Sequence, residues 1–295
     1  MPTETFDTCP SPALALAAED DVRKRERVIR AHSSTATADI SAGIGLAIVR
    51  YLISQSHNVV ILARSAEILR QLQQEHPKQV RPLAGDLADF SLADKAVGLA
   101  QKDYGRLDGL VLNHGAMFGV KSLEDCNIDD WRSMFDINLF SAVAFTKAAL
   151  PPLRHSKGCI VYTSTGASTS TYSTWGPYST SKAALNMLAK QVACEETEVT
   201  AFAIRPGMVD TEMQQSLRET HLAGMKETER AKFQNVSALL KPDQPANVMA
   251  KLAINPDMSL NGQYLRIGKI SVKLFTLDAV AVSQQRIIIL LALFQ

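Results

Sequence analysis

Short runs of β-favouring residues alternate with segments of helical periodicity from about residue 27 to residue 267 of the chain. This alternation is typical of βαβ units, in which crossover helices join parallel strands. Several of the short runs are apolar throughout, as strands are when helices cover both faces of their sheet. We therefore predict a single α/β domain built on a doubly wound parallel sheet. The expected strands are 28–29, 58–62, 80–83, 109–113, 159–163, 200–204 and 264–267, and the expected helices are 44–54, 67–75, 92–104, 128–150, 178–195 and 245–252.

Two terminal stretches fall outside this alternation. Residues 1–26 mix proline, alanine and charged residues, and residues 268–295 follow the last expected strand with no further unit to join. We therefore assign 27–267 to the domain, 1–26 to a mobile N-terminal tail and 268–295 to a C-terminal tail of unknown role. The second tail ends in an apolar run at 287–294, which is too short for a spanning helix of about 20 residues. We expect this run to be exposed.

The charge balance argues against nucleic acid as a partner. The chain has 31 Lys and Arg residues against 30 Asp and Glu residues, and no long block of one sign. Binding to nucleic acid by counterion release needs concentrated positive charge. Hydrophobic residues at 46% and charged residues at 21% are typical of a globular protein. The composition therefore favours an uncharged small molecule as the partner.

The cysteines and histidines show no spacing typical of a metal site. Cys9, Cys126, Cys159 and Cys194 stand far apart without a Cys-x-x-Cys pair, so neither a disulfide framework nor a zinc knuckle is indicated. The six histidines form no His-x-x-x-His pair. The first residues carry acids where a signal peptide needs basic residues. We expect a cytoplasmic protein with reduced thiols, no metal and no membrane span.

The spacing of Tyr178 and Lys182 is the first indication of chemistry. Residues four apart on a helix share one face, so the Lys ammonium can lower the pKa of the phenol. A free phenol titrates near pH 10 and transfers protons poorly at neutral pH, whereas a phenol beside a cation is a usable acid or base. The alternative is an ordinary pair on a helix surface.

Other motifs accompany this pair in a fixed order. The expected strand at 159–163 delivers the hydroxyls of Ser164 and Thr165 to the carboxyl edge of the sheet, where α/β folds bind ligands. The remaining motifs are Gly85-Asp-Leu87, Leu112-Asn-His-Gly-Ala116, Met134-Phe-Asp-Ile-Asn138 and Arg205-Pro-Gly-Met-Val-Asp-Thr211. In this order and at these separations, the set closely resembles the short-chain dehydrogenase/reductase family over about residues 43–267. The resemblance implies a Rossmann-like fold.

Within that family, the sequence around the pair is similar to the branch of sepiapterin reductase and benzil reductase. The similar segments are Thr165-Gly-Ala-Ser, Trp175-Gly-Pro-Tyr178, Lys182-Ala-Ala-Leu-Asn and the motif that begins at Arg205. These relatives are NADPH-dependent carbonyl reductases. The resemblance implies that Tyr178 donates a proton to the carbonyl oxygen, and that Lys182 lowers the pKa of Tyr178 and holds the nicotinamide ribose. It also implies that Asn138 supports a water-linked proton relay.

The residue that polarises the carbonyl has two candidates. The family places a serine 13 residues before the tyrosine, and here that position holds Thr165, with Ser164 one residue earlier. Threonine can supply the same hydroxyl hydrogen bond, although its β-branch restricts the rotamer. We retain both residues and favour Thr165.

The coenzyme contacts are also expected from the resemblance. Arg64 follows the second expected strand, where NAD-preferring relatives place an acid, and a cation there suits the 2′-phosphate of NADPH. The alternative is an ordinary exposed arginine at a strand end. The other expected coenzyme residues are Gly43, Ile44 and Gly45 at the pyrophosphate, Asp86 and Leu87 at the adenine, Asn113 and Gly115 under the adenosine ribose, Lys182, and Pro206, Gly207, Val209 and Thr211 in the turn and loop near the carboxamide.

The opening of the domain departs from the family pattern. The family begins with a strand and Thr-Gly-x-x-x-Gly-Ile-Gly, but Ala38 and Asp39 stand where the threonine and first glycine belong. The strand before them is also truncated. An acid beside a pyrophosphate repels it, and the turn loses a residue that permits its conformation. We therefore expect weakened coenzyme binding through the loop at 30–42.

These observations predict an NADPH-dependent reductase of a small ketone or diketone, aromatic ones included. The alternatives are a catalytically silent member that acts as a scaffold and an NAD-dependent secondary alcohol dehydrogenase. Substrate choice is expected to reside in 118–122 and in the polar segment 212–240. The resemblance also implies a homodimer that pairs through the helices at 128–150 and 178–195.

Overall fold

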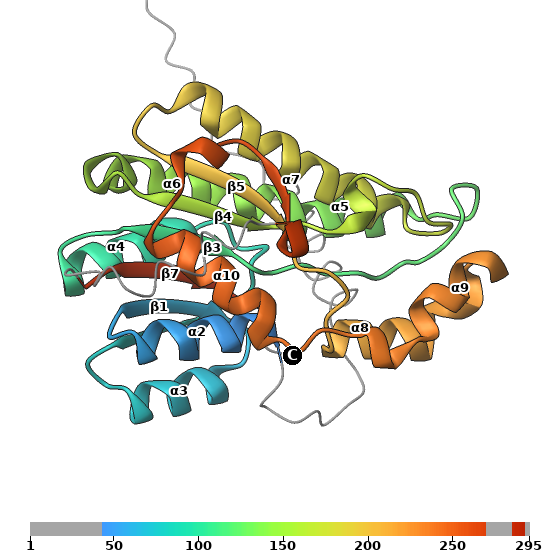
Figure 1. Cartoon of the computed structure of the whole chain (residues 1–295), viewed down its shortest axis with the longest axis horizontal. Helices are drawn as coiled ribbons and strands as arrows, with labels where there is room; N and C mark the ends of the chain where they lie inside the picture. The colour runs from blue at the N-terminus through green and yellow to red at the C-terminus, as the bar shows by residue number, and fades with distance from the viewer. Residues whose placement is uncertain (1–42, 270–284, 293–295) are drawn as a thin grey trace, which may run out of the picture. The chain divides into compact units, whose positions relative to one another are not determined.

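The computed structural model describes residues 43–269 and 285–292 (Figure 1). The tail expected at 1–26, the strand expected at 28–29 and the altered loop at 30–42 lie outside the described residues. All described residues belong to one compact unit that spans 38–295.

The core of this unit is a parallel sheet of seven strands. Their order across the sheet is β2-β1-β7-β3-β4-β5-β6, and every neighbouring pair is parallel. The strands are β1 (Asn58–Ala63), β2 (Val80–Ala84), β3 (Gly109–Leu112), β4 (Cys159–Thr163), β5 (Thr200–Arg205), β6 (Tyr264–Arg266) and β7 (Ile287–Leu291). Six of them lie where the sequence predicts strands.

Helices cover both faces of the sheet (Figure 1). They are α2 (Ile44–Ser54), α3 (Ala66–Glu75), α4 (Leu92–Tyr104), α5 (Ile128–Phe135), α6 (Ser141–Ser156), α7 (Gly176–Glu195), α8 (Glu212–Ser216), α9 (Glu227–Gln234) and α10 (Asp243–Ile254). One apolar cluster joins the sheet to α2, α3 and α10, through residues such as Ile48, Leu69 and Met249. A second cluster joins the opposite face to α4, α6 and α7, through residues such as Phe145 and Leu185. The predicted doubly wound, Rossmann-like α/β fold is confirmed.

The helix expected at 128–150 contains an interruption. A π-helical turn, η1 (Asp136–Phe140), separates α5 from α6. Turns of this kind are rare inside helices and are frequent at functional sites. Asn138 lies in this turn and is fully buried.

The main correction concerns the C-terminal tail. The apolar run that we expected to be exposed forms β7, which pairs with β1 on one side and with β3 on the other. All five residues of β7 are buried. A strand that is apolar on both faces suits the middle of a parallel sheet, because helices cover it above and below. The expectation failed because it assigned strands in chain order, and β7 joins the sheet from the far end of the chain.

Candidate active site

A crevice opens at the carboxyl ends of the strands and brings together most of the residues singled out from the sequence. This edge is where α/β sheets bind ligands. The expected site residues that line the crevice are Gly43, Ile44, Gly45, Asn113, Gly115, Ser164, Thr165, Tyr178, Lys182, Pro206, Gly207, Val209 and Thr211. Residues far apart in the chain therefore meet at one surface.

Tyr178 and Lys182 enter the crevice from the first two turns of α7. Pro177 stands at the start of this helix, where its missing N–H costs nothing. Both side chains are buried, and Lys182 Nζ donates hydrogen bonds to the carbonyls of His114 and Thr163, each at 3.0 Å. The ammonium is therefore held between the loop after β3 and the end of β4.

Burial shifts the pKa values of both side chains. It raises the pKa of the Tyr178 phenol to about 12, against the opposing effect of a hydrogen bond with Thr165. It lowers the pKa of Lys182 to about 7. For the phenol this direction is opposite to the one expected from the lysine spacing, because the cost of desolvating a phenolate dominates. The phenol is consequently protonated at neutral pH, but its raised pKa makes it a weaker acid than a free phenol.

The two candidate hydroxyls point to different partners. Ser164 is buried, and its Oγ donates a 2.6 Å hydrogen bond to Oδ1 of Asn186 on α7. The Oγ1 of Thr165 accepts a 3.3 Å hydrogen bond from the backbone N–H of Ala167, and the Thr165 side chain lies close enough to the Tyr178 phenol to oppose the rise of its pKa. Thr165 is therefore the hydroxyl that lies beside Tyr178, whereas Ser164 connects the end of β4 to α7.

The amide of Asn138 connects three parts of the site. Its Oδ1 accepts a 2.7 Å hydrogen bond from the backbone N–H of Ala116. Its Nδ2 donates to the carbonyl of Ala116 at 3.0 Å and to Oγ of Ser181 at 3.1 Å. Asn138 thus ties the loop after β3 to α7, although it is not among the described residues that line the crevice.

Three expected coenzyme residues lie outside the lining of the crevice as the described residues define it. Arg64 follows β1 and is half-exposed, without an ion-pair partner among the described residues. Asp86 and Leu87 follow β2, where Oδ1 of Asp86 accepts a 2.9 Å hydrogen bond from the N–H of Ala88. All three stand beyond the carboxyl ends of neighbouring strands.

The geometry at the start of α2 suits a phosphate group. The helix begins after Gly43, and within the described ranges no side chain caps its first turn. The N–H groups of a first helical turn bind anions, aided by the helix dipole. Gly115 lies nearby, where a methyl group would stand 2.9 Å from Lys182 Nζ. The residues present therefore fit a dinucleotide.

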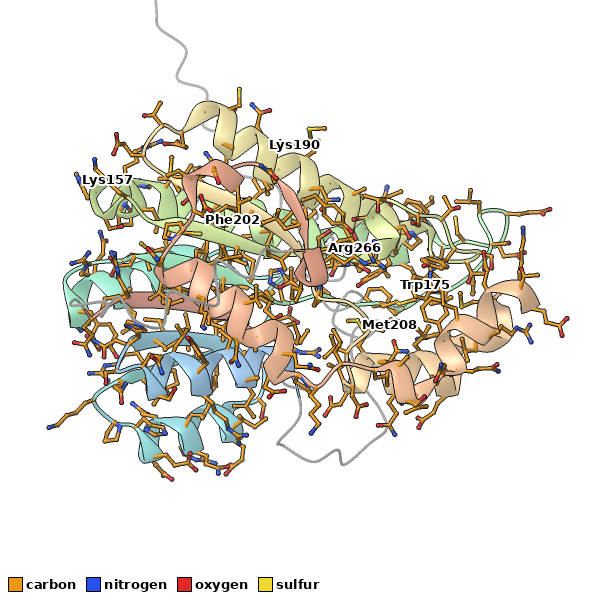
Figure 2. All side chains as sticks on the ribbon, in the orientation of Figure 1. Lys157, Trp175, Lys190, Phe202, Met208 and Arg266 are labelled. Atoms are coloured by element: carbon orange, nitrogen blue, oxygen red, sulfur yellow. The ribbon has the colours of Figure 1, made fainter. Side chains whose placement is uncertain are left out.

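An aromatic wall, formed by Tyr172, Trp175 and Phe233, was not predicted from the sequence. The ring centroids are 4.9 Å apart for Tyr172 and Trp175 and 5.1 Å apart for Trp175 and Phe233, and all three residues line the crevice. Figure 2 shows Trp175 and Met208 on the side from which α8 and α9 extend. Phe233 falls in the segment 212–240 expected to choose the substrate, whereas the lining includes no described residue of 118–122. In the sequence, Trp175 was connected with the site only by its position three residues before Tyr178.

Two negative observations concern the described part of the chain only. No three His, Cys, Asp or Glu side chains gather there in a way that could hold a metal ion. No helix in the same residues has the length and apolarity needed to cross a membrane.

The fold, the crevice and the buried Tyr178–Lys182 pair define a class of protein. The family model for short chain dehydrogenases matches residues 38–222, and the chain belongs to this family of oxidoreductases, whose members use a nicotinamide coenzyme. The match begins at residue 38, after the strand that the family pattern places first.

Relatives from yeast are similar over most of their length. The chain is 41% identical over 244 residues to a Saccharomyces cerevisiae protein named benzil reductase ((S)-benzoin forming) IRC24, covering 77% of this chain and 92% of the relative. It is 37% identical over 234 residues to the uncharacterized oxidoreductase YIR035C of the same yeast, with the same two coverages. The crystal structure of YIR035C superposes with a TM-score of 0.75 at 35% identity and covers 79% of this chain and 94% of that one. The similarity to the benzil reductase branch is confirmed.

Proposed function

We propose that the protein reduces a small ketone or diketone to the alcohol with NADPH. The observation that carries this proposal is the buried Tyr178 phenol, which lines the crevice at the strand ends together with Thr165 and Lys182. A carbonyl oxygen placed against both hydroxyls receives two hydrogen bonds. When bound, NADPH would supply the hydride for the reduction.

Each side chain then has a separate role in the proton transfer. Tyr178 gives its phenolic proton to the carbonyl oxygen as negative charge develops there. Thr165 donates a hydrogen bond to the same oxygen, as in an oxyanion hole. An ammonium has three N–H donors, and two of those on Lys182 are used by the carbonyls of His114 and Thr163. The third donor makes no hydrogen bond within the described residues, and we propose that it binds the nicotinamide ribose.

The aromatic wall supports an aromatic substrate. Tyr172, Trp175 and Phe233 pack against one another and give the crevice an aromatic lining, against which an aryl group of the substrate would pack. Met208 and Met213 add polarizable apolar surface to the lining. The name of the 41% identical yeast relative, benzil reductase, describes an enzyme for a substrate of this kind. We propose an aryl ketone or aryl 1,2-diketone.

Arg64 supports the preference for NADPH over NADH. It follows β1 at the carboxyl edge of the sheet, and the described residues give it no carboxylate partner. A guanidinium binds a phosphate through two parallel hydrogen bonds, which suits the 2′-phosphate.

The test compares wild type with Tyr178→Phe in NADPH consumption with benzil. The variant keeps the ring in its packing, so NADPH binding by thermal shift should persist. Its turnover should fall at least about a hundredfold, because general acid catalysis contributes roughly 10² to 10⁴. Equal turnover in the two proteins would contradict the mechanism. NADPH binding by the wild type without turnover of any carbonyl would favour the catalytically silent scaffold.

We also propose a cytoplasmic homodimer. Phe140 and Val143 at the start of α6 and Met187 on α7 are 47%, 42% and 61% exposed, which leaves apolar surface on the helices expected to pair. A structural relative of 34% identity and TM-score 0.67 is described as a cytoplasmic protein from Saccharomyces cerevisiae. Sedimentation equilibrium measures the mass, and a monomer at micromolar concentration would refute the dimer.

A further inference from the structure

The C-terminal strand β7 lies where the strand order of the sheet reverses. From β1 the chain continues outward to β2, whereas β3, β4, β5 and β6 extend toward the opposite edge. Doubly wound sheets bind their ligands at the carboxyl end of this switch point. β7 fills the position between the two halves, so its carboxyl end lies at the edge of the sheet where the crevice opens.

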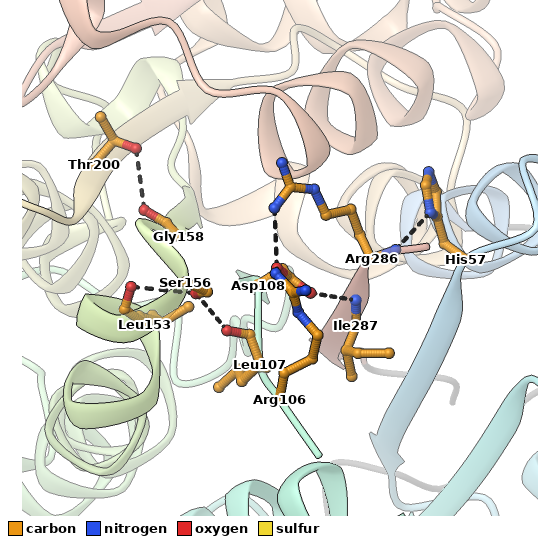
Figure 3. Close-up of polar contacts among 10 residues, drawn as sticks. All are labelled: His57, Arg106, Leu107, Asp108, Leu153, Ser156, Gly158, Thr200, Arg286 and Ile287. Carbon is orange, nitrogen blue, oxygen red and sulfur yellow. Dashed lines mark hydrogen bonds and ion pairs between the residues drawn. The ribbon is translucent and has the colours of Figure 1, made fainter. Parts of the chain in front are cut away.

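The amino end of β7 is fixed by a buried polar cluster (Figure 3). The carboxylate of Asp108, whose side chain is 1% exposed, accepts hydrogen bonds from the backbone N–H of Ile287 at 2.9 Å and from Arg286 at 3.0 Å. Arg106 donates to the same carboxylate. The backbone N–H of Arg286 donates to Nδ1 of His57, which precedes β1. These contacts reach both neighbouring strands and fix the register of β7.

The carboxyl end of β7 meets the start of α2. The backbone N–H of Ala292 donates to the carbonyl of Leu62 at 3.0 Å, and the N–H of Asn113 donates to the carbonyl of Leu291 at 3.0 Å. A methyl group built on Gly45 would stand 2.6 Å from Cβ of Ala292 and 3.0 Å from Nδ2 of Asn113. The absence of a side chain at Gly45 is therefore what lets α2 begin against the end of β7.

We propose that β7 supports the coenzyme site, because Ala292 positions the glycine turn at Gly43 and Gly45. This inference rests on the proposed function for the identity of the coenzyme. Gly43, Ile44 and Gly45 line the crevice, and the first turn of α2 is the anion site described above. Ala292 sets how closely that turn approaches the sheet. The end of the chain therefore affects coenzyme affinity without touching the reacting groups.

Linkage makes this coupling reciprocal. If β7 must be docked for the phosphate site to form, a bound coenzyme must in turn stabilise docked β7 by the same free energy. The amides of 287–291 should therefore exchange with deuterium more slowly when NADPH is present.

The test is a double-mutant cycle in the full chain with Gly45→Ala and Ala292→Gly. Overpacking at Gly45 should weaken NADPH binding about tenfold and lower the melting temperature. In the Ala292→Gly background the atom nearest the new methyl group on the β7 side is Cα of Ala292, at 3.7 Å. The loss caused by Gly45→Ala should there shrink to about threefold, with the remainder due to Asn113. Gly98 supplies the matched control, since it lies in α4 with nothing within 4 Å of an added methyl group.

Three measurements decide the proposal. Additive effects of the two substitutions on melting temperature and on NADPH affinity would overturn it. If Gly45→Ala does not fold, deuterium exchange in the wild type decides, and amides of 287–291 that exchange as fast as an unfolded chain would also overturn it. If the wild type binds no NADPH, the proposed function fails, whereas non-additive melting temperatures would still support the contact between Ala292 and Gly45.

Discussion

Replacing Thr165 by valine tests the site with the least disturbance of its shape. Valine keeps the β-branch and removes only the hydroxyl, which lies beside the Tyr178 phenol in the crevice. Loss of one oxyanion-hole donor costs about 10² to 10³ in kcat. Because the Tyr178 hydroxyl still donates to the same oxygen, we expect the lower end, about a hundredfold. The burial that raises the pKa of Tyr178 to about 12 persists in the variant, so the phenol stays protonated and the acid itself is not lost.

Ser164→Ala provides the matched control, because it removes the neighbouring hydroxyl. That hydroxyl donates a 2.6 Å hydrogen bond to Asn186, so we expect its removal to lower stability. Asn186 is only partly buried, so the loss of this hydrogen bond should cost about 1 kcal/mol of folding free energy. We expect a lower melting temperature and a kcat reduced by about threefold or less.

The assay is NADPH consumption with benzil at saturating coenzyme, with kcat and KM measured separately for each variant. A hydroxyl that acts only in the transition state lowers kcat and leaves KM nearly unchanged. The reasoning would be refuted by the reverse pattern, in which Ser164→Ala lost a hundredfold in kcat and Thr165→Val was as active as the wild type.

Three further outcomes follow from the charges of the structure. Arg64→Asp should reverse the preference for NADPH over NADH in kcat/KM, and an unchanged ratio would show that Arg64 makes no contact with the 2′-phosphate. Burial lowers the pKa of Lys182 from 10.5 to about 7, so the unfolded chain binds more protons between these values. The free energy of unfolding should rise with pH across that interval, and Lys182→Met should flatten the rise in denaturant titrations. The pKa of His57 is also lowered, by burial and then by the charge of Arg286. The free energy of unfolding should therefore fall as the pH drops below about 6.5, and it should fall less in His57→Gln. Parallel plots of unfolding free energy against pH for the two proteins would exclude this role.

Local patterns were enough to predict most of the fold. The helices expected at 44–54 and 92–104 have those bounds in the structure, and Gly105 ends the second in a left-handed conformation with φ of 74°. β7 could not be predicted in the same way, because its place depends on a gap between β1 and β3 that exists only in the folded sheet. A short apolar run by itself does not distinguish a buried strand from an apolar tail.

The sequence predicted which residues meet in the site, but it did not predict the effect of burial on their pKa values. Tyr178, Lys182 and Thr165 were correctly expected in one crevice. The position of a strand end and the four-residue spacing on a helix can both be read from local sequence. The direction of the Tyr178 pKa shift was wrong, since desolvation depends on everything that packs around the phenol. The aromatic wall was missed for a similar reason: Phe233 meets Trp175 only through the fold of the segment after β5.

The central place of β7 also has a consequence for biosynthesis. Residues 287–291 leave the ribosome after every other strand of the sheet, yet β1 and β3 cannot be bridged without them. Until then the nascent chain carries two partial sheets, and the edges of β1 and β3 offer unpaired backbone groups to any neighbouring chain. The sheet therefore cannot close until residues 287–291 are available, and demand for a chaperone should be greatest before that point.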